Sequence, residues 1–409
     1  MFDINKYEYD KEHCVLMIED EAMMYHCHHY LTNLQKTIFD AEYIDSVPFI
    51  VGSAADSVYN QLSNLCRDKS EDESKQSIEQ LYKTFGNGLI DLSSMNENGI
   101  TLTTTKSILS KTWLLQFEKS SQPVDCYTTG FLAAAFAVIY NKNLDEISAK
   151  QTTCMACGDE FNTHIIKLGS SNFTTYLKKS PIVFNETPKV KIDWEHAQAV
   201  TDMFADAHKN FIGNEEGFIP AFGVYVVHNQ SDYINRVQFE FIKAVVEVAG
   251  DYGETQGGEL LMEAGLACGF FTLGGILASP EWKVAVQPLL KTKEDWINAA
   301  MALTNNMGWG YQMAVEVSKE RLIFRNYNDF EDLSYMRMYG KSKTFTHWAN
   351  SGGWSAIMPL IYNTDLIEDG EINSIELFGD VRRSKYGYKI NRTKGISCGD
   401  DFLEVEIYL

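Results

Sequence analysis

The spacing of hydrophobic residues along the chain predicts helices and strands that recur in the same order. Apolar residues with a helical period of about 3.6 occupy residues 20–39 and 240–248. Another helical stretch leads into a Gly-x-Gly turn at Gly86, and a similar stretch leads into the same turn at Gly308. The pattern therefore predicts two similar series of elements rather than one continuous array.

Each series then continues with strands. Alternating, β-rich residues follow the turns at 99–105 and 320–327, and apolar helices follow at 130–141 and 352–363. Both series end on a strand that begins after the tripeptide Cys-Gly-Asp. Because helices that cover an antiparallel sheet define the α+β class, we predict an α+β fold.

Two blocks of sequence occur twice. The strings at 156–168 and 397–409 share Cys-Gly-Asp-acid-Phe at an offset of 398 − 157 = 241. A gap-free block around Gly86 repeats around Gly308 at an offset of 308 − 86 = 222. The difference, 241 − 222 = 19, predicts an insertion within residues 364–394 of the second copy.

These repeats predict two tandem domains of one type that form a pseudo-dimer within the chain. We place the boundary in the proline-bearing stretch 181–188, which gives domains 1–185 and 186–409. Upstream of the two blocks, an offset of 202 pairs His26 with His228 and extends the match weakly.

Composition and charge narrow the choice of partners. Hydrophobic residues make up 45% and charged residues 22% of the 409 residues, which is typical of a globular protein. The net charge of −21 argues against nucleic acid and anionic membranes as partners, because their phosphates would be repelled. An oligomer is compatible with such a chain.

The sequence also indicates a compartment. Its first residues are polar and acidic where a secretory signal needs an apolar stretch. The longest uncharged run, 264–280, is shorter than the roughly 20 apolar residues that span a bilayer, and we expect a buried helix with a glycine-rich turn there. We therefore expect a cytoplasmic protein whose eight cysteines are reduced thiols or metal ligands.

A motif in the last third of the first copy carries a family resemblance. Cys126 precedes a Gly-Phe helix start at Gly130, a Gln-Thr-Thr-Cys string follows and ends at Cys154, and Gly158-Asp159 leads into the final strand. This order resembles the 4-vinyl reductase domain family, to which the second copy is connected only through the internal repeat. The resemblance implies a pocket of helices and sheet, often completed in a dimer, for a small apolar, aromatic or tetrapyrrole-like ligand.

The same resemblance raises the question of a metal. Zinc-bearing members use Cys, Glu, Cys and Cys; this chain keeps Cys126 and Cys154 but has Gln151 and Asn162 at the other two positions. Cys157 offers a substitute thiolate, so zinc at Cys126, Cys154 and Cys157 is one prediction and three packed, buried thiols are the other. In the second copy the matching residues are unsuited to zinc: Trp348, Arg392, Gly395 and Leu403.

The densest group of side chains that could ligate a metal or transfer a proton is Tyr-His-Cys-His-His-Tyr at residues 25–30. Placed on a helix, it gives an apolar arc with His26 and His28 on its two flanks. One interpretation is that these imidazoles orient a ligand whose apolar walls are Trp113 and Phe131; others are hydrogen bonding at a domain seam or metal binding. We expect the second copy to be mainly scaffold.

Two functions from different classes follow. The first is a binding module for a small apolar, aromatic or tetrapyrrole-like molecule. The alternative is a metal-dependent enzyme, with iron or zinc, that uses His26, His28 and nearby carboxylates in the biosynthesis of a small metabolite. Haem is a further possible cofactor, whereas vinyl reduction itself is not inferred, because no nicotinamide or flavin site is recognisable.

Overall fold

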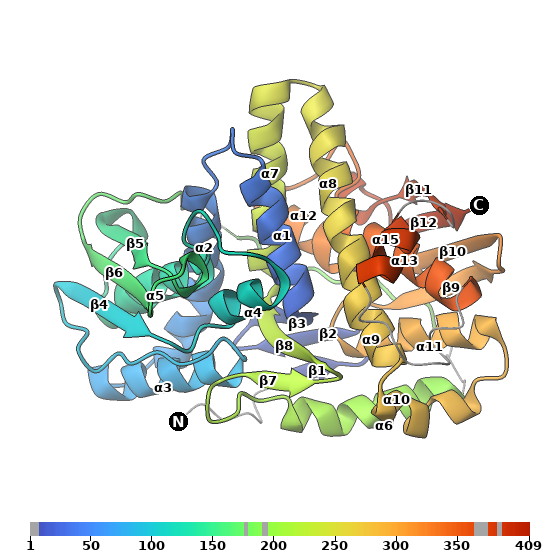
Figure 1. The fold of residues 1–409 in the computed structure, drawn as a ribbon, viewed down its shortest axis with the longest axis horizontal. Helices are drawn as coiled ribbons and strands as arrows, with labels where there is room; N and C mark the ends of the chain where they lie inside the picture. The colour runs from blue at the N-terminus through green and yellow to red at the C-terminus, as the bar shows by residue number, and fades with distance from the viewer. Residues whose placement is uncertain (1–7, 176–178, 190–194, 364–374, 383–386) are drawn as a thin grey trace.

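A computed structural model gives the fold and describes residues 8–175, 179–189, 195–363, 375–382 and 387–409. The described strands form three sheets in which every neighbouring pair is antiparallel. One sheet lies in the middle of the molecule and one lies on either side (Figure 1). The chain is thus an α+β protein, as its pattern predicts.

The central sheet is shared by the two halves of the chain. Its strand order is β1-β2-β3-β8-β7, with the bounds β1 (Glu8–Asp10), β2 (Val15–Ile18), β3 (Glu21–Cys27), β8 (Val224–Gln230) and β7 (Ile219–Ala221). β3 and β8 pair in the middle of this sheet, with Tyr25 opposite His228. The join between the two halves is therefore a continuous backbone ladder.

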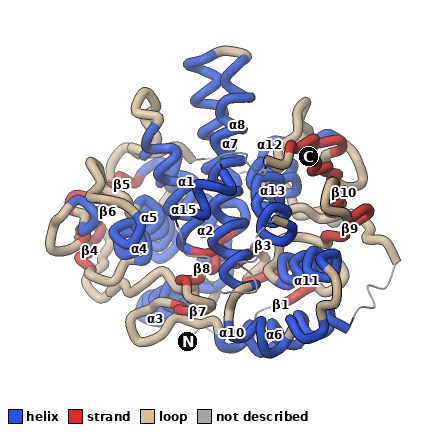
Figure 2. Tube along the Cα trace, turned by 45° about the vertical axis from the view of Figure 1, so that its right-hand side comes forward, coloured by secondary structure: helices blue, strands red, loops and turns tan. Residues whose placement is uncertain are grey.

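Long helices lie beside this sheet in the middle of the molecule, as Figures 1 and 2 show. They are α1 (His28–Asp40), α2 (Val47–Cys66), α7 (Ser231–Ala249) and α8 (Tyr252–Cys268). α8 continues through a π-helical turn at Gly269–Leu273 into α9 (Gly274–Leu277). The tip of the α7–α8 hairpin stands above the rest of the molecule (Figure 2).

The two lateral sheets have the same order in the three strands that they have in common. In the first half, β4 (Gly99–Thr104), β6 (Asn162–Leu168) and β5 (Ile147–Thr153) accompany α3 (Glu71–Thr84), α4 (Ile108–Gln116) and α5 (Cys126–Ile139). In the second half, the order is β9 (Gln312–Val317), β10 (Arg321–Asn326), β12 (Leu403–Tyr408) and β11 (Lys389–Lys394). The helices around it are α11 (Lys293–Asn306), α12 (Phe330–Tyr339), α13 (Trp348–Tyr362) and α15 (Ile375–Arg382). α6 (Glu195–Asn210) and α10 (Pro280–Ala285) lie at the edge of this half.

The pairing registers of these sheets follow the two sequence offsets. Gly99 faces Lys167 in the first half and Arg321 faces Tyr408 in the second, at offsets of 321 − 99 = 222 and 408 − 167 = 241. The irregularity in β5 after Gln151 recurs in β11 after Arg392, again 241 positions later. The glycines of the paired turns also share their backbone, with φ of 83° at Gly86 and 84° at Gly308.

The strands at the start of each half pack on the body of the other half. The Gly88 N–H donates to the carbonyl of Gly217 at 2.9 Å, and the Gly310 N–H donates to the carbonyl of Cys14 at 3.1 Å. The Tyr25 N–H and the His228 N–H make a second such pair, to Met307 and Phe85. These contacts relate the segments at an offset of 228 − 25 = 203, so the weak match of His26 with His228 at 202 is wrong by one residue.

The expected helix over residues 20–39 is also wrong in its first part. Residues 21–27 form strand β3, and α1 begins only at His28. β3 is covered on both faces and reads as a continuous apolar run, which periodicity cannot distinguish from a buried helix. The predicted helix with an apolar arc through residues 25–30 is therefore wrong, because residues 25–27 belong to strand β3.

The glycine-rich run 264–280 also differs from its expected form. It is buried helix, but its glycines lie within α8, the π-helical turn and α9 and do not form a turn. Gly265 and Gly269 allow close approach to α13, because a Cβ there would lie 2.2 Å from the carbonyl oxygens of Ala349 and Gly353. Among the described residues, one helix, Tyr252–Leu277, is long and apolar enough to cross a membrane, but 67% of its apolar window is buried in the fold, as in many core helices.

Candidate functional site

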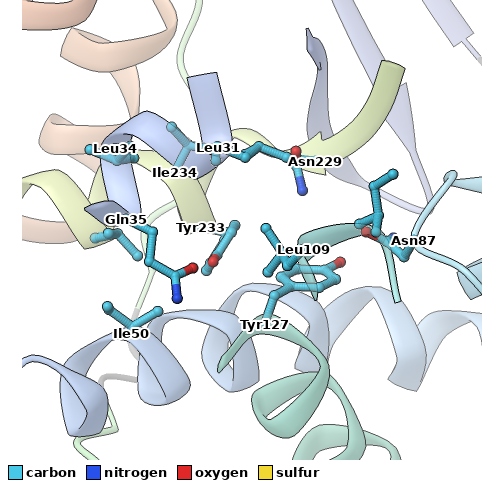
Figure 3. A pocket seen from close by; sticks show the side chains of 12 residues that line it. Leu31, Leu34, Gln35, Ile50, Asn87, Leu109, Tyr127, Asn229, Tyr233 and Ile234 are labelled. Atoms are coloured by element: carbon cyan, nitrogen blue, oxygen red, sulfur yellow. The ribbon is translucent and has the colours of Figure 1, made fainter. Parts of the chain in front are cut away.

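An apolar cavity lies where the two halves meet (Figure 3). We call it the seam cavity. Helices α1, α2, α4, α5 and α7, strand β8 and the Gly-x-Gly turn supply its lining: Leu31, Leu34, Gln35, Ile50, Asn87, Ile108, Leu109, Tyr127, Asn229, Tyr233, Ile234 and Val237. The volume that the centre of a water molecule can occupy in this cavity is about 20 Å³. As it stands the cavity holds roughly one water.

Two asparagines bring unpaired polar atoms to this apolar space. Asn87 Nδ2 and Asn229 Oδ1 have no hydrogen-bond partner, although the two residues are only 2% and 1% exposed. Leaving such a group unpaired and buried costs about 1–3 kcal/mol. One atom is a donor and the other is an acceptor, so a single hydroxyl group placed between them satisfies both.

The local backbone fixes Asn87 at the cavity. Asn87 lies between Gly86 and Gly88, which have φ of 83° and 113°. The Gly88 conformation suits only glycine, because a Cβ there would lie 1.9 Å from the carbonyl oxygen of Lys106. The carbonyl of Asn87 accepts a hydrogen bond from Ile108, the first residue of α4. The turn thus holds the asparagine rigidly against a helix that itself lines the cavity.

The other polar groups of the lining are neutral and mostly occupied. Gln35 Nε2 donates to the carbonyl of Val124 at 2.6 Å, and the Tyr127 hydroxyl donates to Gln230 Oε1 at 3.1 Å. Burial raises the pKa of Tyr127 and of Tyr233 well above their usual range, so both phenols stay protonated. The lining contains no carboxylate, lysine or arginine, and the cavity therefore favours an uncharged occupant.

The corresponding place in the second half is filled by aromatic rings. The offsets of 222 and 203 relate Asn87 to Trp309 and Asn229 to His26, and His26 stacks on Tyr30 with ring centroids 4.4 Å apart. Trp309 lies 5.5 Å from the His26 ring and 5.7 Å from Phe330. The two halves therefore differ at this place: the first half has asparagines at a cavity, and the second half has packed rings.

Neither predicted histidine lines the seam cavity. His26 belongs to β3 and is 2% exposed in the aromatic cluster just described, where burial lowers its pKa to about 3. His28 Nδ1 accepts a hydrogen bond from the Tyr225 N–H at 3.0 Å, and burial, with the neighbouring His29, lowers the pKa of His28 to about 4. Both imidazoles are thus neutral and tied to different neighbours.

The predicted aromatic walls lie beside the cavity rather than on it. Trp113 donates through Nε1 to the carbonyl of Glu118 and packs on Phe39 and Phe117. Phe131 packs behind Tyr127, with ring centroids 6.1 Å apart. The structure therefore does not bring the four predicted ligand residues together, and the asparagine of the Gly-Asn-Gly turn was the signal in the sequence that points to the cavity.

The predicted zinc position is built as a hydrogen-bonded polar cluster. Gln151 Oε1 accepts the Asp125 N–H at 2.8 Å, and Asn162 Oδ1 accepts the Met155 N–H at 2.8 Å. Burial raises the pKa of Cys126 above its usual range and that of Cys157 to about 12, which opposes thiolate formation. Within the part of the chain that the structure describes, no group of three His, Cys, Asp or Glu side chains is placed to hold a metal ion. The residues present therefore do not fit zinc.

The second half contains a buried acidic group that the sequence analysis missed. Asp329 caps α12 through the N–H groups of Glu331 and Asp332, and the Glu331 carboxylate caps α13 through Ala349 and Asn350. Burial and the neighbouring Asp332 raise the pKa of Asp329 to about 7. All the polar contacts of these carboxylates are to helix ends and neighbouring side chains, which makes the group a structural cluster rather than a site open to substrate.

Comparisons with known proteins add little to this geometry. No protein-family model matches the chain, and no curated protein matches it. Among solved structures, the crystal structure of the phenol-responsive sensory domain of the transcription activator PoxR with phenol is similar, with a TM-score of 0.37 and 11% identity. The match covers 51% of this chain and 89% of that chain, and a score this low supports no functional argument.

Proposed function

We propose that this protein binds a small, uncharged, largely apolar molecule with one hydroxyl group in the seam cavity. The observation that carries the proposal is the pair of unpaired atoms, Asn87 Nδ2 and Asn229 Oδ1, at a largely apolar cavity. Apolar contact area supplies most of the affinity for such a ligand, while one or two polar groups set its orientation. A phenol-like ring is the simplest molecule with these properties.

The ligand requires some widening of the cavity, because only about 20 Å³ is now open to the centre of a water molecule. The apolar side chains of the lining, among them Leu31, Leu34 and Ile50, form no hydrogen bonds and are the ones expected to move. A water molecule is the alternative occupant, and it would leave the cavity at its present size.

The relation between the two halves supports a division of roles. We propose that residues 1–185 and 186–409 are two copies of one domain, fused as a pseudo-dimer of the 4-vinyl-reductase type that the sequence resembles. Shared registers at offsets of 222 and 241 and the exchanged strands support this origin. The first copy keeps a cavity, while Trp309 and its neighbours fill the second, which then serves mainly as scaffold.

Calorimetric titration with matched ligands tests the function. We expect phenol to bind at least fivefold more tightly than toluene, because toluene leaves both asparagines unpaired at a cost of about 1 kcal/mol or more. Benzoate is expected to bind more weakly than phenol, because the lining offers its charge no partner. Asn87→Leu should remove the preference for phenol, whereas the exposed Asn98→Ala variant should keep it. Equal affinities for phenol and toluene in the unmodified protein would contradict the proposed recognition.

A further inference from the structure

Two buried cysteines from different halves meet beside one hydroxyl group. Cys27 ends β3 and is the N-cap residue of α1, and Cys268 is the last residue of α8. Cys27 Sγ is in close contact with Thr272 Oγ1, and Cys268 Sγ lies 3.5 Å from the same oxygen. The sulfur atoms are thus neighbours although 241 positions separate them in the sequence.

A histidine connects this pair to the surface. His29 Nδ1 lies 3.8 Å from Cys27 Sγ, and the His29 side chain is half-buried, whereas Cys27 itself is fully buried. The His29 ring is held between Phe271, stacked at 4.6 Å, and His28, whose ring centroid is 4.0 Å away. This fixed imidazole is therefore placed to take a proton from the Cys27 thiol.

The backbone at Cys268 is adapted to this contact. Directly after Cys268, the helix widens into the π-helical turn Gly269–Leu273, which carries Thr272. Single π-helical turns within α-helices occur frequently at functional sites. Here the turn places Thr272 against both sulfurs.

We propose that Cys27 and Cys268 form a redox-active dithiol, which a small hydroperoxide oxidises to a disulfide that links the two halves of the chain. This inference is independent of the proposed ligand. Because both sulfurs are buried, an oxidant that reaches them must be small, and bulky disulfide reagents such as oxidised glutathione are excluded. Cys27 differs from the other described thiols in that an imidazole nitrogen lies 3.8 Å from its sulfur, while a second cysteine contacts the same threonine hydroxyl.

The chemistry takes two steps. The Cys27 proton passes to His29, the sulfur bonds to one peroxide oxygen as the O–O bond breaks, and the leaving oxygen takes the proton from His29. Cys27 becomes a sulfenic acid, and water or an alcohol is released. Cys268 then attacks the Cys27 sulfur, and the sulfenic oxygen leaves as water with the Cys268 proton. In total, the two thiols lose two electrons and two protons. Hydrogen peroxide is reduced to two water molecules, and an organic hydroperoxide is reduced to one water and one alcohol.

Treatment of the full chain with hydrogen peroxide in the presence of a metal chelator tests the proposal. We expect intact-mass analysis to show the loss of two hydrogen atoms per chain, and peptide mapping to place the new bond between Cys27 and Cys268. Reduction with dithiothreitol should reverse the change. The oxidised chain should also melt at a higher temperature, because the new link closes a very long loop.

Two variants separate the steps. Cys268→Ser should accumulate a sulfenic acid at Cys27, which dimedone captures when the oxidised chain is unfolded in its presence, and Cys27→Ser should yield neither product. Cys66→Ser, which removes a half-buried thiol elsewhere, should behave as the unmodified chain. A disulfide that maps to other cysteines, or Cys66 oxidation with Cys27 and Cys268 unchanged in the unmodified chain, would overturn the proposal, and these two results do not depend on how the variants fold.

Discussion

The buried imidazole of His26 makes a specific prediction about acid stability. His26 is 2% exposed, Nδ1 has no hydrogen-bond partner and burial lowers its pKa to about 3. In the unfolded chain the same side chain titrates near its ordinary pKa of about 6.5. The unfolded state therefore takes up a proton first as the pH falls, and the contribution of His26 to stability, complete above about pH 6.5, is lost as the pH falls from there toward 3.

The size of this loss follows from the two pKa values. Between pH 7 and pH 5 the unfolded imidazole becomes almost fully protonated while the folded one stays neutral, which lowers the free energy of unfolding by about 2 kcal/mol. His26→Phe removes the titrating group and keeps a ring to stack on Tyr30. The variant should therefore lose about 2 kcal/mol less stability than the unmodified chain over this pH interval.

Urea denaturation at pH 7 and pH 5 gives the stability lost by the variant and by the unmodified chain. The contributions of the other titrating groups cancel when the two losses are subtracted. Tyr30→Phe is the matched control, because it alters the same cluster and leaves the imidazole in place; its acid sensitivity should equal that of the unmodified chain. If His26→Phe and the unmodified chain lose the same stability between pH 7 and pH 5, the imidazole is not held neutral and the reasoning fails.

Three further predictions concern the turn, the ion pair at the seam and the metal. Gly340→Ala should lower the free energy of unfolding by about 1–3 kcal/mol through backbone strain alone, because a Cβ there meets open space. Gly88→Ala should lower it by more, because its Cβ also meets the Lys106 carbonyl. Thermal denaturation that finds the two variants equally stable would contradict this. Arg236→Met should lower the free energy of unfolding by about 3–5 kcal/mol, because it leaves the Asp56 carboxylate charged and buried. Adding Asp56→Leu to the same chain should recover part of that free energy in urea denaturation. If the double variant recovers none, loss of the ion pair is not the cause. Elemental analysis of protein purified without chelator should find less than one zinc per chain, whereas one equivalent that Cys154→Ser removes would restore the zinc prediction made from the sequence.

Much of the α+β fold was predictable because its signals are local. The helices that lead into Gly86 and Gly308 have clear helical periodicity and are followed by turns that favour glycine, and both are present in the structure as α3 and α11. The repeated blocks likewise correspond to equivalent strand pairs, because the offsets of 222 and 241 found in the sequence recur in the pairing registers. Strand β3 was missed because pairing with β8, about 200 residues away, determines its conformation, and an isolated apolar run contains no sign of that partner.

The candidate site was less predictable for the same reason. The seam cavity takes Asn87 from a turn of the first half and Asn229 from a strand of the second, and no sequence spacing connects them. Histidines attracted the functional interpretation because their chemistry is conspicuous. His26, however, occupies the position that corresponds to Asn229 and packs there against the rings of Tyr30 and Trp309. Exchange of strands between the halves thus decides which residues meet, and only the three-dimensional arrangement reveals it.

A crystal structure of the full chain grown with phenol tests the central claim most directly. We predict density for the ring in the seam cavity, with its hydroxyl oxygen within hydrogen-bond distance of both Asn87 Nδ2 and Asn229 Oδ1 and the neighbouring leucine side chains displaced outward. A cavity that contains only water at saturating phenol, or phenol bound elsewhere on the protein, would contradict the account.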